Sequence, residues 1–188
     1  MTNNNEEILE VVDESGVTIG LETRSNVHKK GLLHKEIHVW FFTPEKEIIF
    51  QHRAKDKETF PDLLDATAGG HLEAGDSFEQ TVLKECLEET GLNLKIEDFV
   101  FVRNLRKESF DEVTGLTNNV IRPQYAYLFK GNIADLRIEE GKSEGFVKVP
   151  LEKILNLSDE EKKKFIYNYW GGEYLEIFKD AAAKLGLI

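Results

Sequence analysis

The alternation of apolar and polar positions over the first two thirds of the chain predicts β-strands. Two pairs of apolar-rich runs, each split by turn-forming residues, predict neighbouring strands at 7–12 and 17–22, and at 36–43 and 47–53. Further runs predict strands at 66–68, 99–105, 118–130 and 145–149. The polar segment 54–65, which contains Pro61, is expected to be a loop.

One helix is expected inside this strand-rich region. Asp76 is a favourable N-cap, Glu79 three residues later completes a capping box, and Gly91 is typical of a helix end. The apolar side of this helix should face a core, and it is formed by Val82, Leu83, Cys86 and Leu87.

The last third of the chain is expected to be helical. A short helix follows Pro150, and Ser158 with Glu161 forms a second capping box that opens a helix to about residue 170. A Gly-Gly break precedes a final helix over 173–185. This order predicts an α/β (α+β) fold with a mixed sheet, in which residues 1–188 form one domain. Residues 1–6 are expected to be frayed, and 158–188 to form a C-terminal helical extension.

Composition narrows the class of protein. The chain has 188 residues, is 40% hydrophobic and 31% charged, and carries a net charge of −11. An acidic chain of this kind is a poor partner for nucleic acid or anionic membranes, although a bound metal can still hold an anionic substrate. The single cysteine, Cys86, excludes an internal disulfide and a cysteine-rich metal site. Without a signal peptide or a long apolar run, we expect a cytoplasmic protein.

The predicted helix carries a cluster of acidic residues. Glu85, Glu88 and Glu89 are spaced i, i+3 and i+4, so they share one face, which we expect to be the solvent side. Like charges at this spacing destabilise a helix by a few tenths of a kcal/mol per pair, so they need solvent or a cation. Mg²⁺ is suited to such oxygen ligands, and Gly69-Gly70 before the helix allow a backbone carbonyl to join them. A solvated acidic face is the alternative.

The spacing of the whole segment is more specific than the glutamates alone. From Gly70 it runs through five residues to Asp76, then through seven to Lys84-Glu85, an apolar residue, any residue, Glu88-Glu89, any residue, Gly91 and an apolar residue. This resembles the box of the Nudix hydrolase family, G-x5-E-x7-R-E-U-x-E-E-x-G-U, where U is apolar. Asp76 and Lys84 are conservative departures from the glutamate and arginine of that box.

The resemblance implies an α/β/α sandwich and a hydrolase that cleaves a diphosphate linkage. It implies that Glu85, Glu88, Glu89 and the carbonyl of Gly69 bind Mg²⁺, or Mn²⁺ in its place. Lys84 would orient a glutamate through a salt bridge. The general base stays open between Glu85, Glu88 and a downstream loop acid, for which Glu144 is the candidate.

A wider segment resembles isopentenyl diphosphate isomerase and its Nudix relatives. The likeness rests on Gly31-Leu-Leu-His34, on Val39-Trp-Phe-Phe42 and on Gln51-His-Arg-Ala-Lys-Asp-Lys57. It implies that Arg53 and Lys57 hold the substrate diphosphate, with Arg24 as a third cation and His71 beside the substrate. Solvated loop charge is the alternative for these cations. Isomerase activity itself is not expected, since the catalytic cysteine is replaced by Gly69 and two glutamates by Arg122 and Gln124.

Three histidines match the second metal site of that isomerase: His28, His34 and His71. Without the two glutamates, we interpret them as ordinary hydrogen-bonding residues near a pocket, although three neutral imidazoles can bind Zn²⁺ or Mn²⁺. The aromatic residues of the C-terminal helices are interpreted as packing residues, and a homodimer contact through them is left open.

Two functions follow from these residues. The first is a Mg²⁺-dependent hydrolase of a small-molecule diphosphate, with nucleoside diphosphates and their derivatives as the substrate class that the resemblance implies. The second is a non-catalytic nucleotide-sensing or interaction module that keeps the fold, which the departures at Asp76 and Lys84 favour.

Overall fold

The computed structural model describes residues 6–57, 60–139, 141–166, 169 and 171–188. Its strands are β1 (Ile8–Val12), β2 (Thr18–Thr23), β3 (Leu33–Phe42), β4 (Glu47–Arg53), β5 (Leu64–Asp65), β6 (Ala68–His71), β7 (Phe99–Asp111), β8 (Leu116–Leu128) and β9 (Ser143–Pro150). Its α-helices are α1 (Arg24–Lys30), α2 (Phe78–Thr90), α3 (Leu151–Ile154), α4 (Asp159–Lys162) and α5 (Gly172–Lys184). Short 3₁₀ turns lie at Ile96–Asp98 and Ile133–Asp135.

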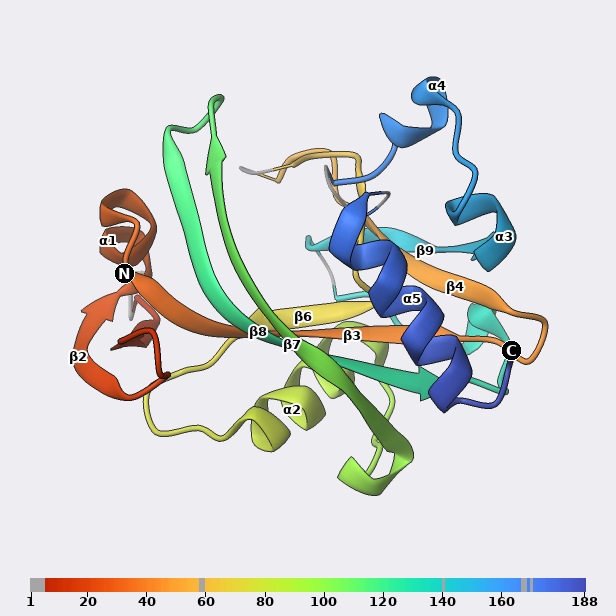
Figure 1. The fold of residues 1–188 in the computed structure, drawn as a ribbon, viewed down its shortest axis with the longest axis horizontal. Coiled ribbons are helices and arrows are strands. Elements are labelled where there is room, and N and C mark those ends of the chain that lie inside the picture. Colours follow the sequence, from red (N-terminus) through yellow and green to blue (C-terminus); the bar gives the residue numbers. More distant parts are fainter. Residues whose placement is uncertain (1–5, 58–59, 140, 167–168, 170) are drawn as a thin grey trace.

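Strand β3 organises a seven-stranded mixed sheet (Figure 1). It runs parallel to β8 and antiparallel to β4 and β6, while β7 pairs with β8 as a long hairpin and β9 pairs with β4. Because both faces of β3 are covered, nine of its ten residues are buried. Strands β1 and β2 form a separate two-stranded sheet.

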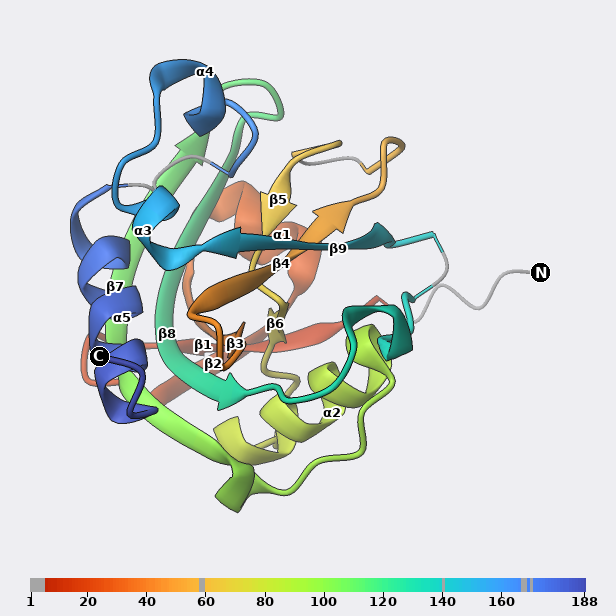
Figure 2. The ribbon, with the colours of Figure 1, turned by 90° about the vertical axis from the view of Figure 1, so that its right-hand side faces the viewer.

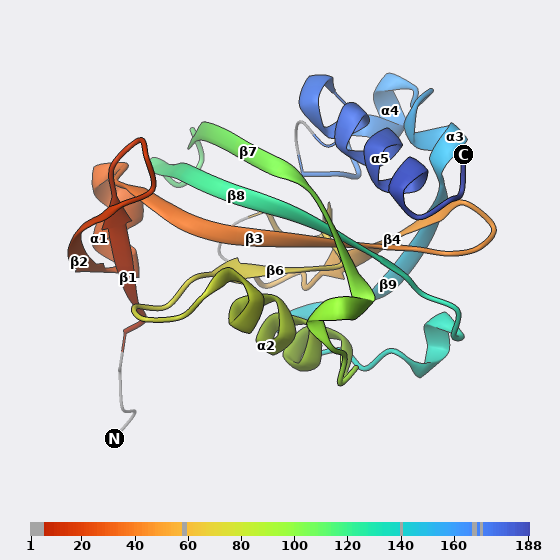
Figure 3. The ribbon, with the colours of Figure 1, turned by 60° about the horizontal axis from the view of Figure 1, so that its bottom comes forward.

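Helices cover opposite faces of the sheet (Figures 2 and 3). On one face, Ile37, Val39 and Phe41 of β3 form a core with Val82 and Cys86 of α2. On the other, Trp40 and Phe42 form a core with residues of α5 that include Ile177, Phe178 and Ala181. The expected mixed α+β fold is confirmed, and strand alternation sends adjacent β3 residues to different cores.

Most of the predicted strands and the terminal helix agree with the structure to within a few residues, and the main differences lie in four segments. The expected loop 54–65 contains β5, and the strand expected at 66–68 is β6 at 68–71. Helix α1 had not been expected; its seven residues end at Gly31, whose φ of 63° a glycine adopts without strain. The helix expected from 158 to about 170 ends at Lys162 as α4, and residues 167, 168 and 170 lie outside the described part of the chain.

The N-terminus of α2 corrects the predicted cap. Ser77, not Asp76, is the N-cap: its side chain accepts from the backbone N–H of Gln80, whose side chain in turn accepts from the N–H of Ser77. The capping box is therefore shifted by one residue from the predicted Asp76–Glu79 pair. Gly91 ends the helix as expected, in the left-handed conformation. Among the described helices, none is long and apolar enough to cross a membrane.

We expect Ser77→Ala to lower the free energy of unfolding by about 0.5–2 kcal/mol, the usual cost of losing an N-cap. The matched control is Asp76→Asn, which we expect to change it by less than about 0.5 kcal/mol because the Asp76 side chain does not cap the helix. Urea unfolding of both variants measures the difference. A larger loss in the Asp76 variant would contradict the shifted capping box.

Candidate active site

Two of the three helix glutamates are buried between α2 and β6. Glu85 and Glu89 are 9% and 8% exposed, and Glu88 is exposed. The N–H of Gly69 donates to Oε2 of Glu89 at 3.0 Å. A Cβ atom at Gly70 would overlap the carboxyl group of Glu85, so only glycine permits this approach. These contacts bring the two carboxyl groups against the Gly69-Gly70 backbone.

The position of Glu89 corrects the expectation that it lies on the solvent side of its helix. It is Leu87, predicted to face the core, that is 49% exposed. Val82 and Cys86 are buried as expected. The helix packs against the sheet with a face that is part apolar and part acidic, because β6 is only four residues long and offers glycine backbone beside the carboxyl groups.

Burial and mutual repulsion make these carboxyl groups weak acids. Burial, followed by the charge of Glu88, raises the pKa of Glu85 from 4.5 to about 7. Burial, followed by the charge of Glu85, raises the pKa of Glu89 to about 8. Buried carboxylates that repel each other need a compensating cation, and oxygen donors of this kind are those that Mg²⁺ prefers.

Gly69 also directs its backbone toward these groups. It lies opposite His38 in the β3–β6 register, and its N–H is used by Glu89. In a strand, the N–H and C=O of one residue point to the same side, so the carbonyl of Gly69 faces the same edge of β6 as its N–H. An additional neutral oxygen therefore lies on the side of β6 that Glu89 occupies.

The two departures from the expected box have different surroundings. The ammonium of Lys84 pairs with Glu73 in the loop between β6 and α2. The expected salt bridge therefore forms with a glutamate that the sequence had not singled out. The carboxylate of Asp76 makes no hydrogen bond or ion pair with any described residue, whereas its N–H donates to the carbonyl of Glu73 at 3.0 Å. Lys84 thus fastens α2 to the loop that precedes it.

The expected diphosphate-binding cations differ in how much they are already engaged. The guanidinium of Arg53 donates to Asp65 at 2.9 Å and to the carbonyl of Phe60 at 3.1 Å. Lys57 is half-buried, and its pKa is lowered by burial and then by the charges of Arg53 and Lys142. Arg53 is therefore already bonded to protein groups, whereas Lys57 lies near other positive charges.

Lys142 is a cation that the sequence reasoning missed. It ion-pairs with Glu139 at 2.8 Å, and its carbonyl accepts from the N–H of Ala54 at 3.1 Å, which joins the turn before β9 to the loop after β4. Burial opposes its charge, but Glu139 and then Glu89 and Glu85 raise the pKa of Lys142. No spacing rule connects residue 142 to the helix glutamates, so only the fold could reveal it.

Two weaker predictions fall elsewhere. Glu144 is exposed, at the irregular stretch of β9 between the partners of His52 and Arg53. Arg24 begins α1, is exposed, and pairs with Glu7 at 3.1 Å. Neither residue makes an ion pair or hydrogen bond to the helix glutamates in the described part of the chain.

The histidines divide into two groups. His28, His34 and His71 offer ring nitrogens that all lie within 4.8 Å of one another. Burial, followed by the neighbouring His71 and His34, lowers the pKa of His28 to about 4, so its imidazole is neutral at neutral pH. His38 lies four residues after His34 on the same face of β3, where its ring packs against those of Trp40 and Tyr169.

A row of charged groups lies beside the three histidines. In register, His71 of β6 lies opposite Glu36 of β3, which lies beside Arg122 of β8. Nε2 of His71 is 3.0 Å from Oε1 of Glu36, and Nε of Arg122 donates to Oε2 of Glu36 at 2.8 Å. Burial would raise the pKa of Glu36, but Arg122 and His71 hold it well below 4.5. The carboxylate of Glu36 was not identified from the sequence.

Comparison with known proteins identifies the family. A sequence profile of the NUDIX domain matches residues 32–169, most of the chain. The chain belongs to the Nudix hydrolase family. An uncharacterized Nudix hydrolase of Clostridium acetobutylicum is 29% identical over 180 residues, which cover 90% of this chain and 84% of the relative.

The Nudix assignment agrees with the isomerase-like branch expected from the sequence. An isopentenyl-diphosphate Delta-isomerase of Photorhabdus laumondii is 27% identical over 126 residues, covering 67% of each chain. A Deinococcus radiodurans protein of known crystal structure superposes with a TM-score of 0.65 at 18% identity, over 93% of this chain and 99% of that one. This Nudix hydrolase therefore has the fold of its family, and the family acts on nucleoside diphosphate-linked small molecules.

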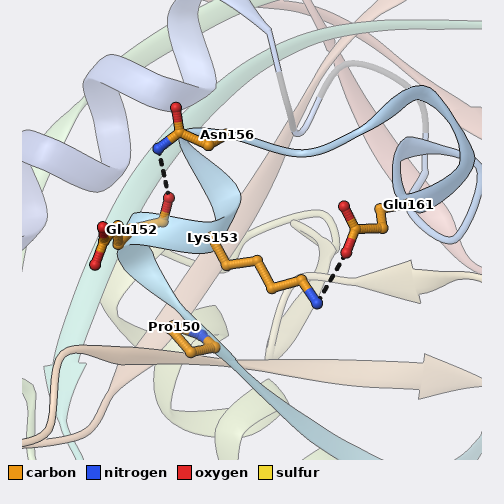
Figure 4. A pocket seen from close by; sticks show the side chains of 5 residues that line it. All are labelled: Pro150, Glu152, Lys153, Asn156 and Glu161. Carbon is orange, nitrogen blue, oxygen red and sulfur yellow. Dashed lines mark hydrogen bonds and ion pairs between the residues drawn. The ribbon is translucent and has the colours of Figure 1, made fainter.

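A surface depression between α3 and α4 is not part of this site (Figure 4). It is lined by Pro150, Glu152, Lys153, Asn156 and Glu161, and Lys153 pairs with Glu161 at 2.9 Å across it. All views place α3 and α4 far from α2. None of the α2 glutamates or the clustered histidines lines it.

The raised pKa values predict how stability depends on pH without metal. Between the usual pKa of 4.5 and the folded values of about 7 and 8, the unfolded chain loses protons that Glu85 and Glu89 retain. The free energy of unfolding should therefore fall as pH rises through this window, by at most about 1.4 kcal/mol per pH unit for each carboxyl. Glu89→Gln should flatten this slope, and Mg²⁺ should restore stability at pH 8.

Urea unfolding from pH 5 to 9 in the presence of a chelator measures this dependence. The control is Glu79→Gln, the same change at an exposed position on α2, which should leave the slope as it is in the wild type. An identical slope in the wild type and in Glu89→Gln would mean that Glu89 ionises in the folded protein as it does in water.

Proposed function

We propose that this protein hydrolyses a diphosphate linkage in a nucleoside diphosphate or a related derivative, with Mg²⁺ bound by Glu85, Glu88, Glu89 and the carbonyl of Gly69. The observation that supports this is the burial of Glu85 and Glu89 against Gly69-Gly70, where burial and repulsion between neighbouring glutamates raise the pKa of both carboxyl groups. Hard oxygen donors of this kind fit Mg²⁺, and Mn²⁺ accepts the same set.

The residues of α2 and β6 would hold the metal and activate the attacking water. When bound, Mg²⁺ polarises the phosphoryl oxygens and lowers the pKa of the attacking water. Gly69 positions the carboxylate of Glu89 through its N–H. Glu88, exposed one turn after Glu85, is free to reach outward to metal or water. The general base is Glu85 or Glu88. Glu144 on β9 is a weaker candidate, because it makes no hydrogen bond or ion pair to the helix glutamates among the described residues.

We assign the phosphate side of the site to Lys57 and Lys142. Their charges act on each other and on Glu89, which means that they face the same region as the helix carboxyl groups. A phosphate bound between two lysines would offset their like charges and accept a charge-assisted hydrogen bond from each. Arg53 donates to Asp65 and so stabilises the loop that carries Lys57. We therefore assign the contact with the substrate diphosphate mainly to Lys57 and not to Arg53.

The proposal is tested by product release from a panel of diphosphate compounds, each with and without Mg²⁺. We expect Mg²⁺-dependent turnover of at least one nucleoside diphosphate derivative. Glu89→Gln should reduce that turnover by at least about 10²-fold, since it removes a charged oxygen from the metal shell. Glu79→Gln on the same helix is the matched control and should retain activity. Binding of the panel without turnover of any member would favour a sensing module instead.

Lys57→Ala should raise KM for every diphosphate substrate by a similar factor, about 10–150-fold if it removes one charge-assisted contact. Lys55→Ala is the control, because Lys55 lies in the same loop and is exposed. Steady-state kinetics on two substrates with different leaving groups provide the comparison. If Lys57→Ala changed the ranking of substrates and not their common KM, Lys57 would contact the leaving group.

A further inference from the structure

The three clustered imidazoles point the same ring nitrogen at a common point. Nε2 of His28 is 3.0 Å from Nε2 of His71, and Nε2 of His71 is 3.0 Å from Oε1 of Glu36. Nε2 of His34 is 3.6 Å from the same Glu36 oxygen. A tetrahedral metal with bonds of about 2.0–2.1 Å holds its donors roughly 3.3 Å apart, so these separations match such a site.

The other nitrogen of each ring faces an oxygen outside the cluster. Nδ1 of His28 is 3.3 Å from the carbonyl of Thr117, and Nδ1 of His34 is 3.0 Å from the carbonyl of Leu32. Nδ1 of His71 faces a carboxylate oxygen of Glu7 at 4.0 Å. Because a carbonyl can only accept, the Nδ1 atoms of His28 and His34 carry the protons, which leaves lone pairs on Nε2. Metal-binding histidines are oriented in this way by partners beyond the metal.

Hydrogen bonds within the cluster do not satisfy all of these groups. His34 is fully buried, and its Nε2 has no hydrogen-bond partner among the described residues. Nε2 of His71 can carry at most one proton, so it can donate to only one of its two neighbours, His28 or Glu36. The buried lone pair on Nε2 of His34 lies near two other imidazoles and a carboxylate oxygen. A cation bound between these groups would satisfy it.

Glu36 divides its two oxygens between the cluster and its surroundings. Oε2 accepts from Nε of Arg122 at 2.8 Å and lies 3.5 Å from the amide of Asn118. Oε1 faces His71 and His34. Arg122 also donates to the hydroxyl of Tyr174 at 2.9 Å, which connects this arrangement to α5. Arg122 therefore positions Glu36 and leaves one carboxylate oxygen for a ligand.

This arrangement overturns the reason for which the histidines were interpreted as ordinary hydrogen-bonding residues. The two isomerase glutamates would stand on β8, at Arg122 and Gln124. Here the carboxylate lies one strand away, at Glu36 on β3, in the same cross-strand row as Arg122 and His71. Three neutral nitrogens and one carboxylate oxygen form the donor set of borderline divalent ions such as Zn²⁺ and Co²⁺.

We propose that His28, His34, His71 and Glu36 bind one Zn²⁺-like transition-metal ion, with Arg122 orienting Glu36. The site is distinct from the carboxylates of α2. Gly70 meets Glu85 on the face of β6 that α2 covers, whereas His71 lies opposite Glu36 on the other face. The proposal does not depend on diphosphate hydrolysis.

The test uses the full chain, stripped with a chelator and titrated with Co²⁺ and then Zn²⁺. We expect one equivalent of Co²⁺ to give the intense visible absorption of a four-coordinate nitrogen and oxygen site, and Zn²⁺ to displace it. His28→Gln should weaken Co²⁺ binding by more than the about 10–100-fold that losing an outer partner costs. His52→Gln is the control, since His52 pairs with Asp62 outside the cluster and should bind as the wild type does.

Two further variants separate the alternatives. The double variant Glu85→Gln/Glu89→Gln should keep the four-coordinate spectrum. If the spectrum disappeared in this variant, the Co²⁺ would be bound by the glutamates of α2 and the proposal would be overturned. Glu36→Gln should weaken binding, but it also removes the counter-ion of Arg122, so His28→Gln decides if that variant unfolds. Absence of the spectrum in the wild type, or its persistence in His28→Gln, would overturn the proposal.

Discussion

The close approach of two buried carboxyl groups to a glycine backbone is the constraint on which the site depends. Glu85 can lie where it does only because Gly70 has no side chain, and Glu89 is held by the N–H of Gly69. The same burial raises the pKa of both carboxyl groups. The close approach to the glycine backbone and the weakened acidity therefore have one physical origin.

Strand alternation places two chemically different clusters on opposite faces of β3 and β6. On the α2 side, Ile37 and Gly70 face each other beneath the carboxyl groups of α2. On the α5 side, His71, Glu36 and Arg122 form a row across three strands. In this row the buried charge of Glu36 is compensated by Arg122, whereas the α2 carboxyl groups repel each other. A buried charge must be either paired or neutralised by a proton. Arg122 pairs with Glu36, whereas the raised pKa values favour the protonated forms of Glu85 and Glu89.

The sequence predicted the elements and residues whose signals are local. The spacing from Gly70 to Gly91 identified the glutamate cluster and the family, and the family and fold were confirmed by comparison. Errors arose where two local signals compete. Asp76 and Ser77 are both good caps with a Glu or Gln three residues later, and the structure places the capping box at Ser77 and Gln80. Amphipathicity likewise placed Leu87 inward and Glu89 outward, the reverse of what the packing against β6 requires.

The sequence by itself identified the glutamate cluster of α2 and the glycines before it. Helical spacing and glycine position involve residues that are close together in the chain, so a local pattern reveals them. Only the tertiary structure decided which distant groups meet them. The turn before β9 brings Lys142 to where its charge acts on Glu85 and Glu89, and Glu36 meets His71 and Arg122 through strand pairing. Strand register and burial are set by contacts between segments far apart in the chain, and no local pattern encodes them.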